Sequence, residues 1–117
     1  MIIDIRLVAS LRDDPEAAAC ARAIEAASHR RVSAVNFVEA AIVIDGSRDP
    51  VTSRRFYDLG REAQLVIEPA TEARARVARE AYRVFGRGCG HPAGLNFEDC
   101  FAYALARITG ERTSLRP

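Results

Sequence analysis

The sequence lacks lysine and tryptophan, and all 17 of its basic residues are arginine. The absence of lysine has two compatible interpretations. One is an arginine-biased genome composition, and the other is phosphate recognition, for which the planar guanidinium group is well suited. The formal net charge is only +1, which gives no overall attraction to nucleic acid. Composition alone therefore neither requires nor excludes an anionic partner.

Long apolar runs are also missing. None approaches the roughly 20 residues needed to cross a bilayer. The first residues, Met1 to Asp4, carry no basic region and no apolar signal segment. We therefore expect no membrane association and a cytoplasmic location. Hydrophobic residues nevertheless make up 49% of the 117 residues, which argues against disorder and predicts one domain with a single core.

Cysteine and histidine are scarce. The cysteines, Cys20, Cys89 and Cys100, are odd in number and form no Cys-x-x-Cys pair, which argues against a disulfide framework or a structural zinc site. We expect all three to be buried, reduced thiols. His29 and His91 stand alone without metal-ligand spacing, and both are predicted to lie in loops or on the surface.

Short apolar strands alternate with helices along the chain. Strands are predicted at 2–3, 31–35 and 64–68, and helices at about 7–11, 17–27, 36–46, 50–61, 72–85 and 96–108. This order favours an α/β fold in which helices cover both faces of a short parallel sheet. The predicted domain comprises residues 1–110, and an irregular tail follows at 111–117.

Three acidic residues break the local pattern. Glu39 shares a helical face with the apolar Val35, where a solvated side chain is not expected. Asp4 ends the first predicted strand, at the edge where open α/β sheets place their sites. Asp99 follows Asn96 at the spacing of a capping box. Each acid also has a structural interpretation, as a residue at the edge of an apolar stripe, a turn residue and a helix cap respectively.

A common location would give these acids a function. Two carboxylates ~5 Å apart repel by roughly 3 kcal/mol at an effective dielectric constant of ~20. If the fold brings Asp4, Glu39 and Asp99 to one cleft, they therefore need a cation, and hard oxygen ligands select Mg²⁺ or Mn²⁺. Such an ion retains waters, one of which can be activated to attack a phosphodiester.

Three blocks of the sequence together resemble a VapC-type PIN domain. They are Met1-Ile2-Ile3-Asp4 with Leu7-Val8-Ala9, the run from Ser33 to Glu39, and the run from His91 to Ala106. The likeness covers about residues 1–110, and the third block is the most specific.

The resemblance implies a three-layer α/β/α fold and a metal-dependent endoribonuclease toxin. In such a protein the acids matching Asp4, Glu39 and Asp99 hold Mg²⁺ or Mn²⁺ and are catalytic. The resemblance also implies an RNA substrate, a VapB-like antitoxin partner and a toxin homodimer.

The sequence departs from the family pattern at three places. Ile5-Arg6 replaces a small polar pair, Glu98 occupies a usually small position, and the tail at 111–117 replaces the usual last strand and its fourth acid. We therefore expect the last strand to be missing or altered. The departures leave open a decayed, catalytically impaired toxin homologue that retains antitoxin binding. A third possibility is an unrelated α/β domain whose acids only cap helices or face solvent.

Overall fold

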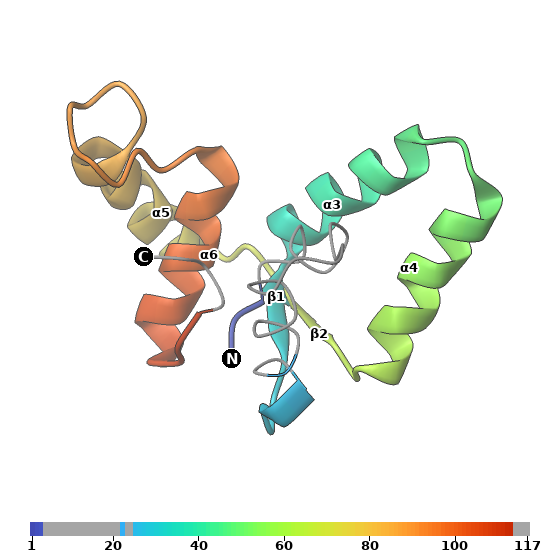
Figure 1. Ribbon diagram of the computed structural model, residues 1–117. Coiled ribbons are helices and arrows are strands. Elements are labelled where there is room, and N and C mark those ends of the chain that lie inside the picture. Colours follow the sequence, from blue (N-terminus) through green and yellow to red (C-terminus); the bar gives the residue numbers. More distant parts are fainter. Residues whose placement is uncertain (4–21, 23–24, 114–117) are drawn as a thin grey trace.

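The computed structural model describes residues 1–3, 22 and 25–113. Along the described chain run β1 (Arg31–Ser33), α3 (Ala34–Gly46), α4 (Pro50–Glu62), β2 (Val66–Glu68), α5 (Glu72–Phe85) and α6 (Phe97–Thr109) (Figure 1). The four helices predicted after residue 30 are confirmed, and α3 begins two residues earlier than expected. The helix predicted at 7–11 and most of the one predicted at 17–27 lie outside the described residues.

The strands form a short parallel sheet. β1 pairs with β2, with Val32 opposite Ile67. Ile2 lies on the side of β1 away from β2, where it forms a β-bridge with Arg31. On its other side, Ile2 forms a second β-bridge with Thr113. Both bridges are parallel, so the order across the sheet is β2, β1, Ile2, Thr113. The chain after α6 thus reaches the edge of the sheet, at the place where the sequence predicted a missing or altered last strand.

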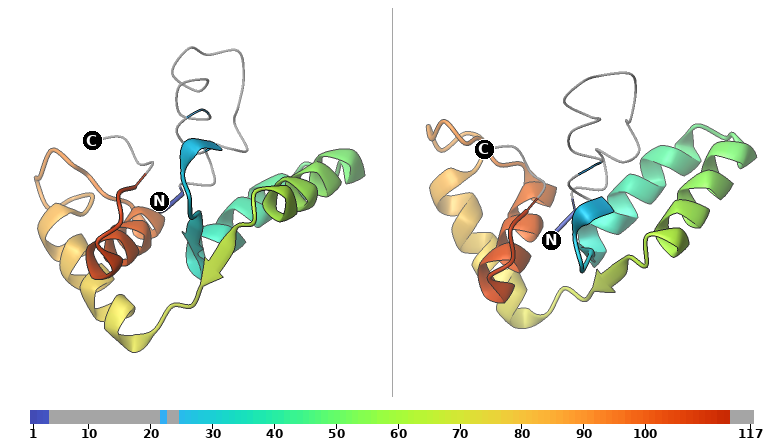
Figure 2. Two further views of the ribbon diagram at one scale, coloured as in Figure 1. Left: turned by 90° about the horizontal axis from the view of Figure 1, so that it is seen from below. Right: turned by 60° about the horizontal axis from the view of Figure 1, so that its bottom comes forward.

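Helices cover both faces of this sheet, which confirms the three-layer α/β/α prediction (Figures 1 and 2). On one face α6 packs Leu105 against Ile2, and both residues are almost fully buried. On the other face α3 packs Ala40 against Val32, with Phe37 beside them. The outer helix α5 joins α6 through small buried side chains: Ala78, Ala81, Cys100 and Ala104.

Helices α3 and α4 form a hairpin that extends away from the sheet (Figure 1). None of the residues of α4 is buried, and the helix is attached mainly by Phe56, whose ring stacks on Phe37 at 5.8 Å. Local chemistry starts α4. The carboxylate of Asp49 caps the helix by accepting from the Val51 N–H at 3.0 Å, and Pro50 has no N–H to leave unpaired.

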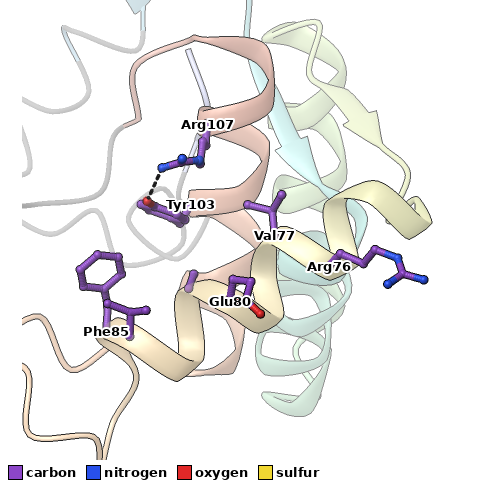
Figure 3. A pocket seen from close by; sticks show the side chains of 8 residues that line it. Arg76, Val77, Glu80, Phe85, Tyr103 and Arg107 are labelled. Carbon is purple, nitrogen blue, oxygen red and sulfur yellow. Dashed lines mark hydrogen bonds between the residues drawn. The ribbon is translucent and has the colours of Figure 1, made fainter.

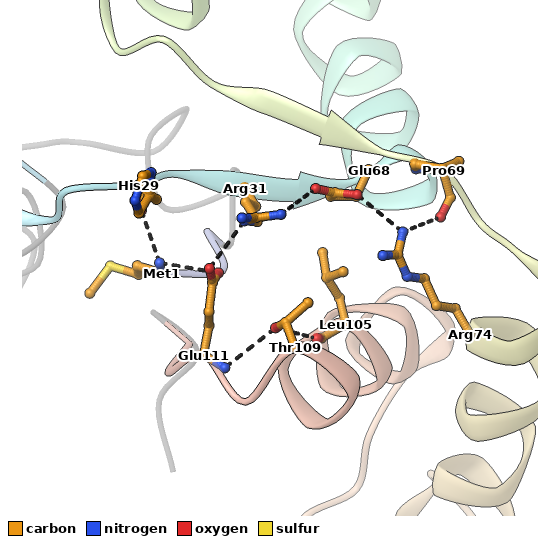
Figure 4. A network of polar contacts seen from close by, with 9 residues as sticks. All are labelled: Met1, His29, Arg31, Glu68, Pro69, Arg74, Leu105, Thr109 and Glu111. Carbon is orange, nitrogen blue, oxygen red and sulfur yellow. Dashed lines mark hydrogen bonds and ion pairs between the residues drawn. The ribbon is translucent and has the colours of Figure 1, made fainter.

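A polar network connects the sheet to α5 and to the segment after α6 (Figure 4). Arg31 lies between Glu68, at 2.7 Å, and Glu111, at 3.1 Å. Glu68 also accepts from Arg74 at 3.2 Å, and Glu111 pairs with the amino group of Met1 at 3.4 Å. We call these five residues the sheet-edge network. It fixes both the start of the chain and the segment after α6 to β1.

The cysteine prediction is correct in one respect and wrong in another. Cys89 and Cys100 are free thiols, but only Cys100 is buried. Cys89 is exposed because it lies in the glycine-rich loop between α5 and α6, which runs over the surface. Cys20 lies outside the described residues. His29 and His91 are exposed, as predicted.

Candidate functional site

The N-termini of α3 and α6 lie close together. Ser33 ends β1 and caps α3 by accepting from the Val35 N–H at 3.2 Å. On the first turn of α3, Asn36 donates from its side-chain amide to the backbone oxygen of Glu98 on α6, at 3.0 Å. Helix N-termini carry partial positive charge and favour anions nearby. The backbone therefore makes this end of the sheet suitable for carboxylates and phosphate groups.

A groove of about 460 Å³ lies between these two helices. Glu39 from α3 and Glu98 from α6 line it together with apolar residues: Ala34, Val35, Val38, Ile42 and Phe97. We call it the acidic groove. Glu39 is half-buried and lies among the apolar neighbours that its helical spacing predicted. Its Oε2 atom is buried, so the carboxylate lies partly within the protein beside the groove rather than on an open surface.

Asp99 closes a capping box at the start of α6. Its carboxylate accepts from the Asn96 N–H at 3.1 Å, and its own N–H donates to the Asn96 side chain at 2.8 Å. The structural interpretation of Asp99 is thus correct. Its charge also acts on Cys100: burial, and after it the negative charge of Asp99, raises the pKa of the Cys100 thiol above its usual value. The cap fixes the Asp99 carboxylate beside Glu98.

The predicted metal ligands are only partly described. Glu39 and Asp99 lie on two helices that pack together, whereas Asp4 lies outside the described residues. Ile3, the residue before Asp4, is buried and donates to the Arg31 carbonyl oxygen on β1 at 2.7 Å. The described part of the chain contains no group of three or more His, Cys, Asp or Glu side chains that could hold a metal.

Sequence reasoning missed the roles of Asn36 and Glu98. Asn36 is only 3% exposed, and its buried Oδ1 has no hydrogen-bond partner among the described residues. A buried polar atom of this kind needs an explanation, such as a water or an ion. The signal was an asparagine inside the apolar run that begins at Val35. Glu98 was noticed only as a departure from a pattern, yet it lines the same groove as Glu39.

A second hollow, of about 410 Å³, lies on α5 and the second half of α6 (Figure 3). Its aromatic wall is Phe85 and Tyr103, and Arg107 donates to the Tyr103 hydroxyl at 3.2 Å. Its one acid, Glu80, is exposed and is paired with Arg83 at 3.1 Å. This hollow therefore offers less for metal chemistry than the acidic groove.

Comparisons with known proteins identify relatives of the whole fold. A family model described as the PIN domain matches residues 5–113. Ribonuclease VapC28 of Mycobacterium tuberculosis is 55% identical over 107 residues, which cover 91% of this chain and 80% of that protein. Ribonucleases VapC30 and VapC42 of the same species are 42% and 38% identical, over 95% of this chain and 85% and 86% of their own lengths. Among the described residues, no helix is both long and apolar enough to cross a membrane.

Proposed function

Because the chain belongs to the PIN domain family, we propose that it is a VapC-like toxin that hydrolyses RNA phosphodiester bonds. The observation that carries this proposal is the acidic groove, which holds Glu39 and Glu98 where the N-termini of α3 and α6 meet. The high identity to VapC28, a protein named as a ribonuclease, supports the reaction class. Neighbouring carboxylates repel one another unless a cation lies between them, so from the proposed convergence of Asp4, Glu39 and Asp99 we infer a metal-dependent reaction.

Glu39 and Glu98 line the groove, Asp99 follows Glu98 on α6, and Asn36 has a buried amide oxygen without a described partner. Because the described acids alone form no metal site, the proposed site requires Asp4 as a further ligand. Oxygen-only ligand sets select Mg²⁺ or Mn²⁺. We propose Asp4, Glu39 and Asp99 as the metal ligands and catalytic acids. When bound, such an ion supplies positive charge beside the scissile phosphate and makes water more acidic.

The protein's own residues position the substrate. The N-termini of α3 and α6 favour a phosphate at the mouth of the groove. The capping box holds Asp99 in place without a change of conformation, because its partner Asn96 is in the same turn. The apolar side chains of Val35, Val38 and Ile42 line the groove beside Glu39. Exposed arginines of α5 bind the RNA backbone.

The same groove suits a protein inhibitor. Val38 and Ile42 are 53% and 65% exposed beside the two glutamates. A segment that combines apolar side chains with an arginine fits this surface, and we propose a VapB-like antitoxin as its source. We also propose that the toxin forms a homodimer and acts in the cytoplasm.

The proposal is tested by RNA cleavage with Mg²⁺ or Mn²⁺. We expect cleavage to stop with a chelator, to return with Mn²⁺, and to fall by at least about 100-fold in Glu39→Gln and Asp4→Asn. The matched control is Glu62→Gln, which removes an exposed carboxylate at the end of α4 and should retain full activity. Metal-independent cleavage, or equal activity of Glu39→Gln and Glu62→Gln, would contradict the proposal.

The decayed-toxin alternative predicts a different result. Wild-type protein would then bind the antitoxin but would cleave no RNA with either metal. The substitution Arg6→Ser, which restores a small polar residue after Asp4, would be the first variant to examine for recovered cleavage.

A further inference from the structure

A small slot lies next to the acidic groove and shares Phe97 with it. Its volume is about 180 Å³, below the roughly 300–1,000 Å³ of typical ligand pockets, so it suits a single planar ring. The residues that line it come from α5 and α6: Ala75, Ala78, Arg79, Tyr82, Phe97, Cys100 and Phe101. We call it the aromatic slot. Phe97 lines both hollows, which makes the slot a direct neighbour of the acidic groove.

Two of its rings are exposed and have defined neighbours. Phe97 is 63% exposed and contacts Phe101 edge-on, with ring centroids 5.2 Å apart. Tyr82 is 43% exposed, and its hydroxyl donates to the Arg87 carbonyl oxygen at 3.3 Å. The Tyr82 ring lies so close to Gly86 that a Cβ there would be 2.9 Å from its Cγ. These contacts restrict the movement of both rings.

Among the described residues that line the slot, one is charged, namely Arg79. Arg79 has no acidic partner among the described residues, whereas Arg76 and Arg83 pair with Glu72 and Glu80. Arg76, Arg79 and Arg83 share one face of α5 by helical spacing. The two ion pairs on this face cancel in charge, which leaves a net charge of 3 − 2 = +1 carried by Arg79. Arg79 is therefore the group on this side of α5 that can contact a phosphate.

We propose that the aromatic slot binds one unpaired base of the RNA, next to the phosphate in the acidic groove. This proposal rests on the proposed function. The base stacks on Phe97 and Tyr82, and Arg79 contacts the adjoining phosphate. An apolar protein side chain could fill the slot but would leave Arg79 unused, so the combination of exposed rings and an unpaired cation favours nucleic acid. Stacking of this kind is tolerant of base identity. The slot thus requires single-stranded RNA without fixing its sequence.

The test measures binding apart from catalysis. Single-stranded RNA oligonucleotides carrying 2-aminopurine are titrated in a chelator, and stacking is read from the quenching of the fluorescent base. We expect Phe97→Leu to abolish the quenching and to weaken binding roughly 5- to 100-fold, while Phe97→Tyr retains both. Tyr57→Leu is the matched control, because Tyr57 is 57% exposed and lies between two arginines on α4. It should change the dissociation constant by less than about twofold.

Salt dependence tests the role of Arg79. Arg79→Gln should weaken binding and lower the slope of log affinity against log salt by about 0.7, as expected for one lost phosphate contact on a single strand. Arg55→Gln, which removes an exposed arginine of α4, should leave the slope unchanged.

The outcomes separate this proposal from the proposed function. Loss of quenching in Phe97→Leu supports the slot even if no metal-dependent cleavage is found. Normal cleavage with unchanged RNA binding by Phe97→Leu overturns the slot and leaves the nuclease proposal intact. Unchanged RNA binding combined with weaker binding of a basic, apolar peptide also overturns it, because the slot then belongs to a protein partner. Circular dichroism melting of each variant confirms that it is folded.

Discussion

Glu68 and Glu72 provide a direct test of how burial changes the contribution of an ion pair to the free energy of unfolding. Each glutamate contacts an arginine at similar distance: Glu68 contacts Arg31 at 2.7 Å, and Glu72 contacts Arg76 at 2.8 Å. Their surroundings differ. The Glu68 side chain is 14% exposed and also contacts Arg74, whereas that of Glu72 is 79% exposed. The substitutions Glu68→Gln and Glu72→Gln therefore remove the same charge from two environments.

The expected magnitudes follow from these environments. Unit charges ~3 Å apart attract by roughly 5 kcal/mol at an effective dielectric constant of ~20, an upper bound that desolvation reduces. Breaking a fully buried pair costs about 3–5 kcal/mol and breaking an exposed pair about 0–1 kcal/mol. Glu68 lies between these limits and leaves Arg74 without its carboxylate. We expect Glu68→Gln to lower the free energy of unfolding by about 2–3 kcal/mol and Glu72→Gln by less than about 0.5 kcal/mol.

Urea denaturation followed by circular dichroism measures both values. At an m-value of ~1–3 kcal/mol/M, Glu68→Gln should lower the urea midpoint by roughly 1–2 M with m unchanged. In 1 M salt the Debye length falls to ~3 Å, so the small effect of Glu72→Gln should disappear while most of the effect of Glu68→Gln remains. Equal losses of stability in the two variants, or a loss in Glu68→Gln that salt removes, would refute the argument from burial.

Two further predictions concern titration. Hydrogen bonds from the Thr52 hydroxyl and the Val51 N–H lower the pKa of Asp49 below 3.8, so Asp49 stabilises the fold above about pH 4 and this contribution is lost as the pH falls through the lowered pKa. Asp49→Asn retains a helix-capping side chain that does not titrate. Its melting temperature should therefore fall less than that of the wild type as the pH is lowered from 4 to 2. Equal falls in melting temperature for the two proteins would contradict this. Burial raises the pKa of the Cys100 thiol. Iodoacetamide at pH 8 should therefore label the exposed Cys89 well before Cys100, as measured by peptide mass spectrometry. Faster labelling of Cys100 than of Cys89 would contradict this prediction.

The helices could be predicted from sequence because their start signals are local. Asp49-Pro50 begins α4, Thr71 caps α5, and Asn96 with Asp99 forms the box that starts α6. Each of these signals depends on residues within a single turn, so the neighbouring sequence contains the full cause.

The site could be predicted only in part, because its contacts join distant segments. The apolar surroundings of Glu39 follow from helical spacing, but its neighbour Glu98 comes from a helix 59 residues later along the chain. The amide contact of Asn36 with that helix has no local signal either. The convergence of Asp4 with Glu39 stays a prediction. The sheet-edge network was missed for the same reason, since Arg31 and Glu111 are far apart in sequence.

The pairing of Ile2 with both Arg31 and Thr113 has a consequence for how the chain folds. Ile2 can pair with both Arg31 and Thr113 only after nearly the whole polypeptide has been synthesised. Closing a loop of this length costs chain entropy before the contact contributes any stability, which slows folding. The sheet is therefore completed late, by a single long-range step that brings the two ends of the described chain together.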